Sequence, residues 1–225
     1  MAEQLAFDLP VREARGRTDF FVSPANATAL AAIESWDTWP MGKLVLVGPL
    51  GSGKTHLAHV WAALTGGTII DAAALNKVKL PMLASGGAVC IEDADCPNVD
   101  EHLLLHLHNL LIEERGTVLF TAATPPRDWS FSLRDLQSRV IAAPVAVLAP
   151  PDDALLRAVL LKQFADRQLR VSPALVEWLV SRIERSFAAV KSAVEQLDAA
   201  ALSKSRPLTR ALAAQVLDNQ GAGRA

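Results

Sequence analysis

The stretch of this sequence best suited to chemistry is a glycine-rich loop that ends in a lysine and a threonine. Its eight residues match the pattern G-x-x-x-x-G-K-[ST] in full, and they are Gly48, Pro49, Leu50, Gly51, Ser52, Gly53, Lys54 and Thr55. Glycines let the backbone curl so that its N–H groups point at phosphate oxygens. In such a loop the lysine reaches the β- and γ-phosphates and the threonine hydroxyl ligates Mg²⁺. The loop therefore predicts a site for a nucleotide and Mg²⁺.

A second group of candidate residues is a pair of acids about forty residues later. Glu92 and Asp93 directly follow the apolar run Ala88–Ile91, which has the composition of a buried strand. Ligands of such folds bind at the carboxyl ends of the strands. We expect Glu92 to help Thr55 hold Mg²⁺ and Asp93 to polarise an attacking water, although two solvated loop acids remain the simpler alternative.

The elements that position these residues alternate between short apolar runs and helical patterns. This alternation predicts an α/β fold with a five-stranded parallel sheet flanked by helices. The expected strands are 44–47, 68–70, 88–91, 117–120 and 143–148. The expected helices are 26–36, 54–65, 72–83, 100–115 and 133–139.

The alternation stops at Ala149-Pro150-Pro151, and every later segment has a helical pattern. The sequence therefore predicts a nucleotide-binding subdomain at 18–150 and a small all-helical lid at 151–220. Ser172 is a good helix cap because Pro173 follows it at the first helical position. Residues 1–17 lack a periodic apolar face and are expected to form a flexible arm.

Composition excludes several classes of protein. The formal net charge of −2 shows no excess of Lys and Arg, so strong direct DNA binding is not expected. No signal peptide or apolar run of membrane-spanning length is present, which favours the cytoplasm. His102, His106 and His108 lack a further ligand of a metal site and are expected to be ordinary helix residues.

Two segments strengthen the nucleotide hypothesis, because they resemble the DnaA replication initiators. One is the end of the glycine-rich loop, and the other lies upstream of it. Gly53-Lys54-Thr55-His56-Leu57 resembles the loop of that family, and 19–26 resembles the segment that wraps the adenine. The resemblance covers roughly residues 18 to 205 and implies an AAA+ P-loop NTPase fold that binds ADP or ATP. It also implies that certain residues border the nucleotide, namely His56, Phe21, Val22 and Asn26.

The segment Leu136-Gln137-Ser138-Arg139 resembles the part of the family that carries an arginine finger. By this resemblance Arg139 is the catalytic candidate, acting on the nucleotide of a neighbouring protein. The alternative is an ordinary surface arginine paired with Asp135, one helical turn earlier.

The N-terminal peptide Gln4-Leu5-Ala6-Phe7-Asp8-Leu9-Pro10 resembles the short peptides that dock on the bacterial sliding clamp. In this interpretation the clamp-binding residues are Gln4, Leu5, Phe7 and Leu9. Together with the initiator-like core, the peptide is similar to the Hda-type DnaA homologues, which inactivate DnaA after replication has started. The resemblance implies DnaA and the clamp as partners and leaves a homo-oligomer open.

Two positions depart from the pattern of an active initiator. Ala123 stands where a polar residue senses the γ-phosphate, and Ala188 stands where a lid arginine reaches the nucleotide. Thr121 or Thr124, and Arg185, are the candidates for compensation. Losing these groups removes stabilisation of γ-phosphate charge, so we expect weak intrinsic hydrolysis.

The resulting hypothesis is a nucleotide-bound regulator that docks on the clamp and promotes hydrolysis of DnaA-bound ATP. The alternative is an ATP-dependent helicase loader of the DnaA/DnaC-like group. A free-standing ATPase with its own turnover is the third possibility.

Overall fold

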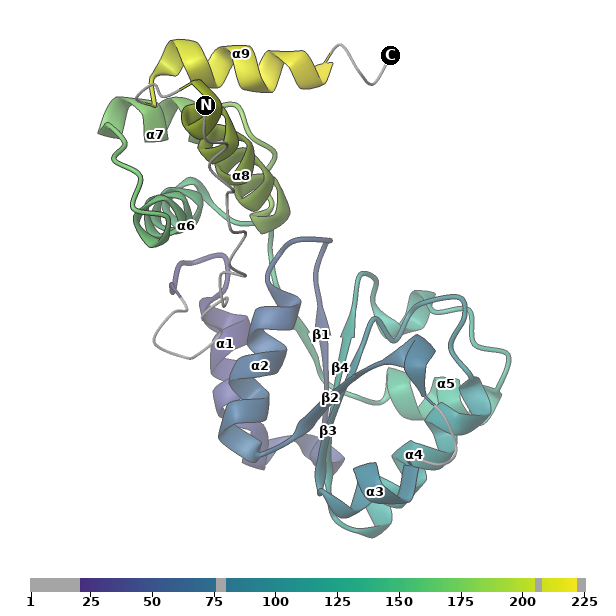
Figure 1. Ribbon diagram of the computed structural model, residues 1–225. Helices are drawn as coiled ribbons and strands as arrows, with labels where there is room; N and C mark the ends of the chain where they lie inside the picture. The colour runs from purple at the N-terminus through teal and green to yellow at the C-terminus, as the bar shows by residue number, and fades with distance from the viewer. Residues whose placement is uncertain (1–20, 76–79, 205–207, 222–225) are drawn as a thin grey trace, which may run out of the picture.

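The protein contains a five-stranded parallel sheet whose strand order is β2-β3-β4-β1-β5 (Figure 1). The computed structural model describes residues 21–75, 80–204 and 208–221. The strands are β1 (Lys43–Val47), β2 (Thr68–Asp71), β3 (Ala88–Glu92), β4 (Thr117–Ala122) and β5 (Val145–Val147). The predicted parallel sheet is thus confirmed, with each strand close to its expected position.

Helices cover both faces of this sheet (Figure 1). One face carries α1 (Ala27–Glu34) and α2 (Lys54–Thr65). The other carries α3 (Leu80–Ser85), α4 (Glu101–Glu113) and α5 (Arg134–Ile141). Short 3₁₀ helices occur in the segments that connect the strands and α-helices. They are η2 (Trp36–Thr38), η3 (Pro40–Gly42), η4 (Ala72–Ala74) and η6 (Pro126–Asp128).

The apolar character of β1 follows from this double cover. All five of its residues are buried, and successive side chains point to opposite faces of a strand. Val45 and Val47 join the cluster under α3, α4 and α5, whereas Leu44 and Leu46 join the cluster under α1 and α2. A strand buried on both faces has no polar side, which is why the sequence shows a continuous apolar run.

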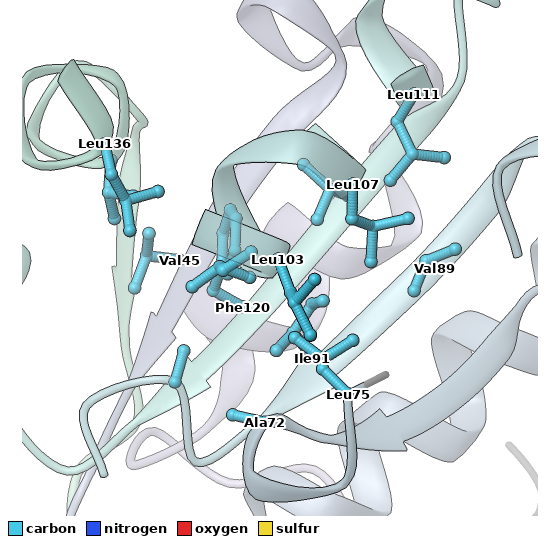
Figure 2. Close-up of a cluster of buried hydrophobic side chains, with 14 of the residues drawn as sticks. Val45, Ala72, Leu75, Val89, Ile91, Leu103, Leu107, Leu111, Phe120 and Leu136 are labelled. Carbon is cyan, nitrogen blue, oxygen red and sulfur yellow. The ribbon is translucent and has the colours of Figure 1, made fainter. Parts of the chain in front are cut away.

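Figure 2 shows how α4 packs on its face of the sheet. Leu103, Leu107 and Leu111 recur at every fourth position and form one stripe of the helix, which is buried. They lie over Val89 and the neighbouring strand residues of the same cluster. The leucine run of this segment is therefore core.

One expected helix is wrong in part. The segment 72–83 was expected to be a single helix, but the structure has the 3₁₀ turn η4 and then α3 from Leu80. The Asp71 side chain accepts a hydrogen bond from Ala73 N at 2.8 Å, and this cap favours a tight turn. Leu75 then has an extended backbone with φ −61° and ψ 134°.

The lid consists of α6 (Asp153–Asp166), α7 (Pro173–Val180), α8 (Phe187–Lys204) and α9 (Arg210–Gly221). Its core is separate from the two sheet clusters and is formed by Leu160, Phe164, Leu179, Val194 and their neighbours. The Ser172 hydroxyl accepts a hydrogen bond from Leu175 N at 3.2 Å, as expected of a cap. Within the described ranges, no helix has the length and apolar character needed to span a bilayer.

His108 is an exception to the apolar packing of α4. Its side chain is 1% exposed, and neither ring nitrogen has a hydrogen-bond partner within the described part of the chain. Burial, followed by the positive charge of Lys43, lowers the pKa of His108 below its ordinary 6.5. The folded protein therefore favours the neutral imidazole, and protonation of His108 opposes folding.

We expect His108→Leu to stabilise the protein by about 1 kcal/mol at neutral pH, because an unsatisfied buried polar group costs roughly 1–3 kcal/mol. The unfolded chain takes up the His108 proton near pH 6.5, whereas the folded chain does so only at lower pH. Stability thus falls as pH drops below about 6.5, and the substitution removes this loss. Urea denaturation at pH 7.5 and 5.5 measures both effects.

His106→Leu is the matched control, because His106 is exposed on the same helix. An equal gain in both variants, or an unchanged pH dependence in His108→Leu, would contradict the role given to burial.

Candidate functional site

The glycine-rich loop connects the carboxyl end of β1 to the first turn of α2. Gly51 and Gly53 have φ values of +72° and +102°, which side chains with a Cβ rarely adopt. A Cβ on Gly48 would lie 2.7 Å from the Leu148 carbonyl oxygen. The backbone conformation and the close approach of β5 thus require glycine at these three positions.

Lys54 is the cation of this loop and is only 8% exposed. Its Nζ donates hydrogen bonds to the carbonyl oxygens of Gly48 at 2.7 Å and Pro49 at 3.1 Å. Burial lowers the pKa of Lys54, and the negative charges of Asp93, Asp95 and Glu92 act in the opposite direction. The loop lysine and the acids at the end of β3 therefore belong to one electrostatic site.

The two predicted acids differ in their surroundings. Glu92 ends β3 and is half-buried, whereas Asp93 is exposed and has a positive φ of 50°. The Asp93 backbone N–H donates to the Thr121 hydroxyl at 3.1 Å. The hydroxyl of the buried Thr121 is the acceptor of this hydrogen bond. The bond holds the start of the loop that follows β3.

Asp95 is a residue of the site that the sequence analysis missed. One of its carboxylate oxygens accepts hydrogen bonds from Ala123 N, Thr124 N and the Thr124 hydroxyl, each at 2.9 Å. Asp95 thus holds the loop after β4, where the γ-phosphate sensor was expected. This contact engages Thr124. No spacing in the sequence indicates the contact, because Asp95 and its partners are 28 and 29 residues apart.

The residues assigned to Mg²⁺ have suitable chemistry, since a hydroxyl and carboxylates are oxygen donors of the kind Mg²⁺ prefers. The Thr55 side chain is exposed and Glu92 is half-buried at the same edge of the sheet. Over the described residues, no group of three or more His, Cys, Asp or Glu side chains has a metal-binding arrangement. Thr55 and Glu92 would therefore hold Mg²⁺ together with phosphate oxygens of a nucleotide.

Asn26 was assigned to the adenine pocket with Phe21 and Val22. It is 3% exposed, and its Nδ2 donates to the Phe21 carbonyl while its Oδ1 accepts from Ser23 N, both at 2.8 Å. Asn26 therefore shapes the wall of this segment, while the side chains of Phe21 and Val22 are 41% and 54% exposed. The segment lies beside the sheet–lid connection, because Ala149 N donates to the Ala25 carbonyl at 3.3 Å.

The amino end of α8 in the lid contacts the glycine-rich loop directly. Phe187 N donates to the Gly51 carbonyl at 2.8 Å. A Cβ on Gly53 would lie 2.9 Å from the Phe187 ring, and one on Gly51 would lie 3.5 Å from the Ala188 methyl group. Ala188 thus lies over the loop, and its assignment as the position of the lost lid arginine stays a prediction.

Arg185, the candidate substitute for that lost cation, is engaged elsewhere. Its Nη2 lies 2.8 Å from the Asp153 carboxylate, and both side chains are more than half exposed. The polar residues proposed to compensate for Ala123 and Ala188 therefore all have other partners in this structure.

Arg139 lies far from the loop of its own chain. Its backbone carbonyl accepts a hydrogen bond from Lys43 Nζ at 2.7 Å, and Lys43 is the first residue of β1. The loop begins at the other end of that strand, roughly 13 Å away at ~3.3 Å per residue. The Arg139 side chain is 37% exposed, and its Nη2 lies 3.3 Å from the Asp135 carboxylate. Arg139 is thus half-buried at the end of β1 opposite its own phosphate site.

Two further contacts fix the segment that leads into α5, the helix that carries Arg139. Glu101 on α4 accepts hydrogen bonds from Ser132 N, the Ser132 hydroxyl and Leu133 N at 2.7–3.0 Å. Burial raises the pKa of Glu101, but these hydrogen bonds outweigh it and the net pKa is lowered. On the other side, Trp129 packs edge-on against Phe120 with ring centroids 6.4 Å apart.

The proposed clamp-binding residues, Gln4, Leu5, Phe7 and Leu9, lie outside the described residues. Their assignment stays a prediction.

Comparison with known proteins places the lid in a family. Residues 153–217 match the family model described as "Hda, lid domain". This range covers α6, α7, α8 and most of α9.

Solved structures share the fold of most of this chain. Domain III of the Thermotoga maritima replication initiation protein DnaA superposes with a TM-score of 0.76 and 17% identity, over 94% of this chain and 98% of that one. The AMPPCP-bound DnaA from Aquifex aeolicus gives 0.62 and 14%, over 79% and 63%. Thermotoga maritima RuvB, as its R170A variant, gives 0.70 and 17%, over 91% and 72%. The AAA+ fold is thereby confirmed, and the chain spans about two thirds of the longer DnaA chain.

We expect Ala188→Arg to increase the affinity for ATP over that for ADP by roughly 10- to 100-fold, because a hydrogen bond to a charged group contributes about 1.5–3 kcal/mol. The new guanidinium would start from a methyl group that already lies over the glycine-rich loop. Titration calorimetry with both nucleotides and Mg²⁺ measures the ratio. Ala199→Arg, at an exposed position farther along α8, is the control for charge alone, and an equal change in both variants would refute the assignment of Ala188.

Proposed function

We propose that this chain binds an adenine nucleotide and promotes hydrolysis of the ATP bound to DnaA. In this proposal the chain is a DnaA-related AAA+ protein with an Hda-type lid, and it regulates replication. The observation that carries this proposal is the position of Arg139, which is held at the opposite end of β1 from the chain's own loop. An arginine placed there has no access to its own nucleotide and is available to a neighbour's.

In this proposal the chain's own site serves chiefly to hold ADP or ATP with Mg²⁺. Backbone N–H groups of the loop and Lys54 bind the phosphates, and Thr55 and Glu92 complete the Mg²⁺ ligands. Bound Mg²⁺ neutralises phosphate charge. Asp93 is the candidate to polarise water. With alanine at 123 and 188, and with Arg185 paired to Asp153, the γ-phosphate lacks two stabilising groups, so intrinsic turnover is slow.

Arg139 acts on DnaA as an arginine finger. The guanidinium is planar and always charged, so it stabilises the negative charge that develops on the transferring γ-phosphoryl group of a partner. Such a residue accelerates hydrolysis by about 10³–10⁵ in GTPases. The exposed ion pair with Asp135 contributes little free energy and is easily exchanged for a phosphate contact.

In this proposal the N-terminal peptide brings the chain to the sliding clamp. Gln4 would hydrogen bond at one subsite of the sliding clamp, while Leu5, Phe7 and Leu9 would fill its apolar pocket. Tethering to the clamp raises the local concentration of the chain without new contacts to DnaA. The regulator would therefore act once a clamp has been loaded on DNA.

Arg139→Ala should lower the stimulated rate of DnaA-bound ATP hydrolysis by at least about 10³-fold, because the transition-state charge loses its cation. Arg139→Lys should restore little, since a point charge does not reproduce the planar guanidinium. Single-turnover hydrolysis by ATP-loaded DnaA, with clamp and DNA present, measures the rate. Arg134→Ala, which removes an exposed arginine of the same helix, should leave it within about threefold. Retained stimulation in Arg139→Ala sinks the proposed function.

Gln4→Ala should weaken binding to the sliding clamp by about 5- to 150-fold, since a lost hydrogen bond in an interface leaves its partner unpaired at a cost of about 1–3 kcal/mol. Surface plasmon resonance on immobilised clamp measures the affinity. Glu3→Ala, immediately outside the peptide, is the control, and unchanged clamp affinity in Gln4→Ala would remove the clamp from the mechanism.

A further inference from the structure

Lys43 is a buried cation that has no part in the proposed function. It is the first residue of β1 and is only 1% exposed. Within the described part of the chain its Nζ has one hydrogen-bond partner, the Arg139 carbonyl oxygen at 2.7 Å. A buried ammonium group loses its hydration, and a single carbonyl replaces that hydration only in part. Packing alone would therefore favour an apolar residue at this position.

The carbonyl that Lys43 contacts lies in the last turn of α5, where carbonyl groups lack partners within the helix. The two residues after α5 close this turn with backbone hydrogen bonds of 3.1 and 3.0 Å, from Ala142 N to the Ser138 carbonyl and from Ala143 N to the Val140 carbonyl. Neither of these bonds uses the Arg139 carbonyl, which lies between them. Lys43 supplies the donor, and its positive charge is favourable at the carboxyl end of a helix. The bond thus ties the backbone of Arg139 directly to β1.

The charges around Arg139 differ between its outer and inner sides. On the outer side its Nη2 lies 3.3 Å from the carboxylate of Asp135, whose side chain is 62% exposed. On the inner side lies Lys43: burial lowers the pKa of Lys43, and the positive charge of Arg139 lowers it further. Like charges repel, so the Lys43 ammonium group opposes a rotation of the guanidinium toward the sheet. One buried cation thus holds the backbone of Arg139 and disfavours inward positions of its side chain.

We propose that Lys43 is a positioning residue for Arg139, which it holds through the carbonyl contact and keeps on the outer side of α5. This inference rests on the proposed function, in which Arg139 acts on the ATP of DnaA. A displacement of a reacting group by about 1 Å can lower a rate by about 10²-fold. Because Lys43 is buried, it makes no contact with a partner. Lys43 therefore affects the rate of hydrolysis and leaves the affinity for DnaA unchanged.

The first test is Lys43→Met in the full-length chain, since methionine is a long side chain without the ammonium group. Single-turnover hydrolysis by ATP-loaded DnaA, with clamp and DNA present, is measured over a range of variant concentrations. We expect the maximal rate to fall by about 10- to 100-fold, while the concentration that gives half of this rate stays within about threefold of the parent. A parental maximal rate overturns the inference.

His108→Leu is the matched control, because His108 is a second buried base beside Lys43 and does not contact the Arg139 carbonyl. It should keep the maximal rate within about threefold of the parent, since the bond from Lys43 remains. An equal loss of rate in both variants would indicate a general packing effect and would overturn the inference. Unfolding midpoints check that the variants are folded, and Lys43→Leu takes the place of Lys43→Met if the latter is not.

Amide hydrogen exchange in the free chain tests the position of Arg139 without DnaA. In Lys43→Met the N–H groups of Ala142 and Ala143 should exchange at least about tenfold faster, because they close the turn that loses its bond to β1. The N–H groups of α2 should exchange as in the parent. Unchanged exchange at Ala142 and Ala143 overturns the inference and leaves the proposed function intact. Stimulation that persists in Arg139→Ala defeats the proposed function instead, and the exchange rates still decide whether Lys43 holds this turn.

Discussion

The parallel pairing of β1 with β4 on one side and β5 on the other is the constraint on which the rest of the structure depends. All of these strands run in one direction, so the glycine-rich loop after β1 and the acids after β3 meet at one edge of the sheet. The same direction places Lys43, and with it Arg139, at the opposite edge. One strand thus separates the residues that bind a nucleotide from the residue proposed to act on another protein's nucleotide.

Contacts between distant segments hold both edges in place. Asp95 ties the loop after β3 to the loop after β4, and Glu101 ties α4 to the start of α5. Each carboxylate accepts hydrogen bonds from two backbone N–H groups and one hydroxyl, and such charge-assisted hydrogen bonds are strong. The lid adds a contact from Phe187 to Gly51. These contacts make the site a rigid scaffold rather than a set of loops.

The pattern of losses and gains in this chain is consistent with a regulator rather than a motor. Ala123 and Ala188 stand where the resemblance to the initiators expects a polar group and a cation near the γ-phosphate, while the Arg139 side chain is 37% exposed. A protein arranged in this way keeps the capacity to bind a nucleotide. In the proposed function, its chemistry is directed outward, toward the nucleotide of DnaA.

The sequence by itself determined the glycine-rich loop, the acids after β3, the five strands and most helices, because these depend on local patterns such as apolar runs, caps and glycine spacing. It did not reveal the extended Leu75, the buried His108, or the contacts of Asp95, Glu101 and Lys43. The contacts of Asp95, Glu101 and Lys43 depend on partners 28 to 96 residues away, and local periodicity carries no information about such pairs. Only the tertiary structure decided that Arg139 faces away from its own loop, because that position follows from the direction of β1 and the packing of α5 against it.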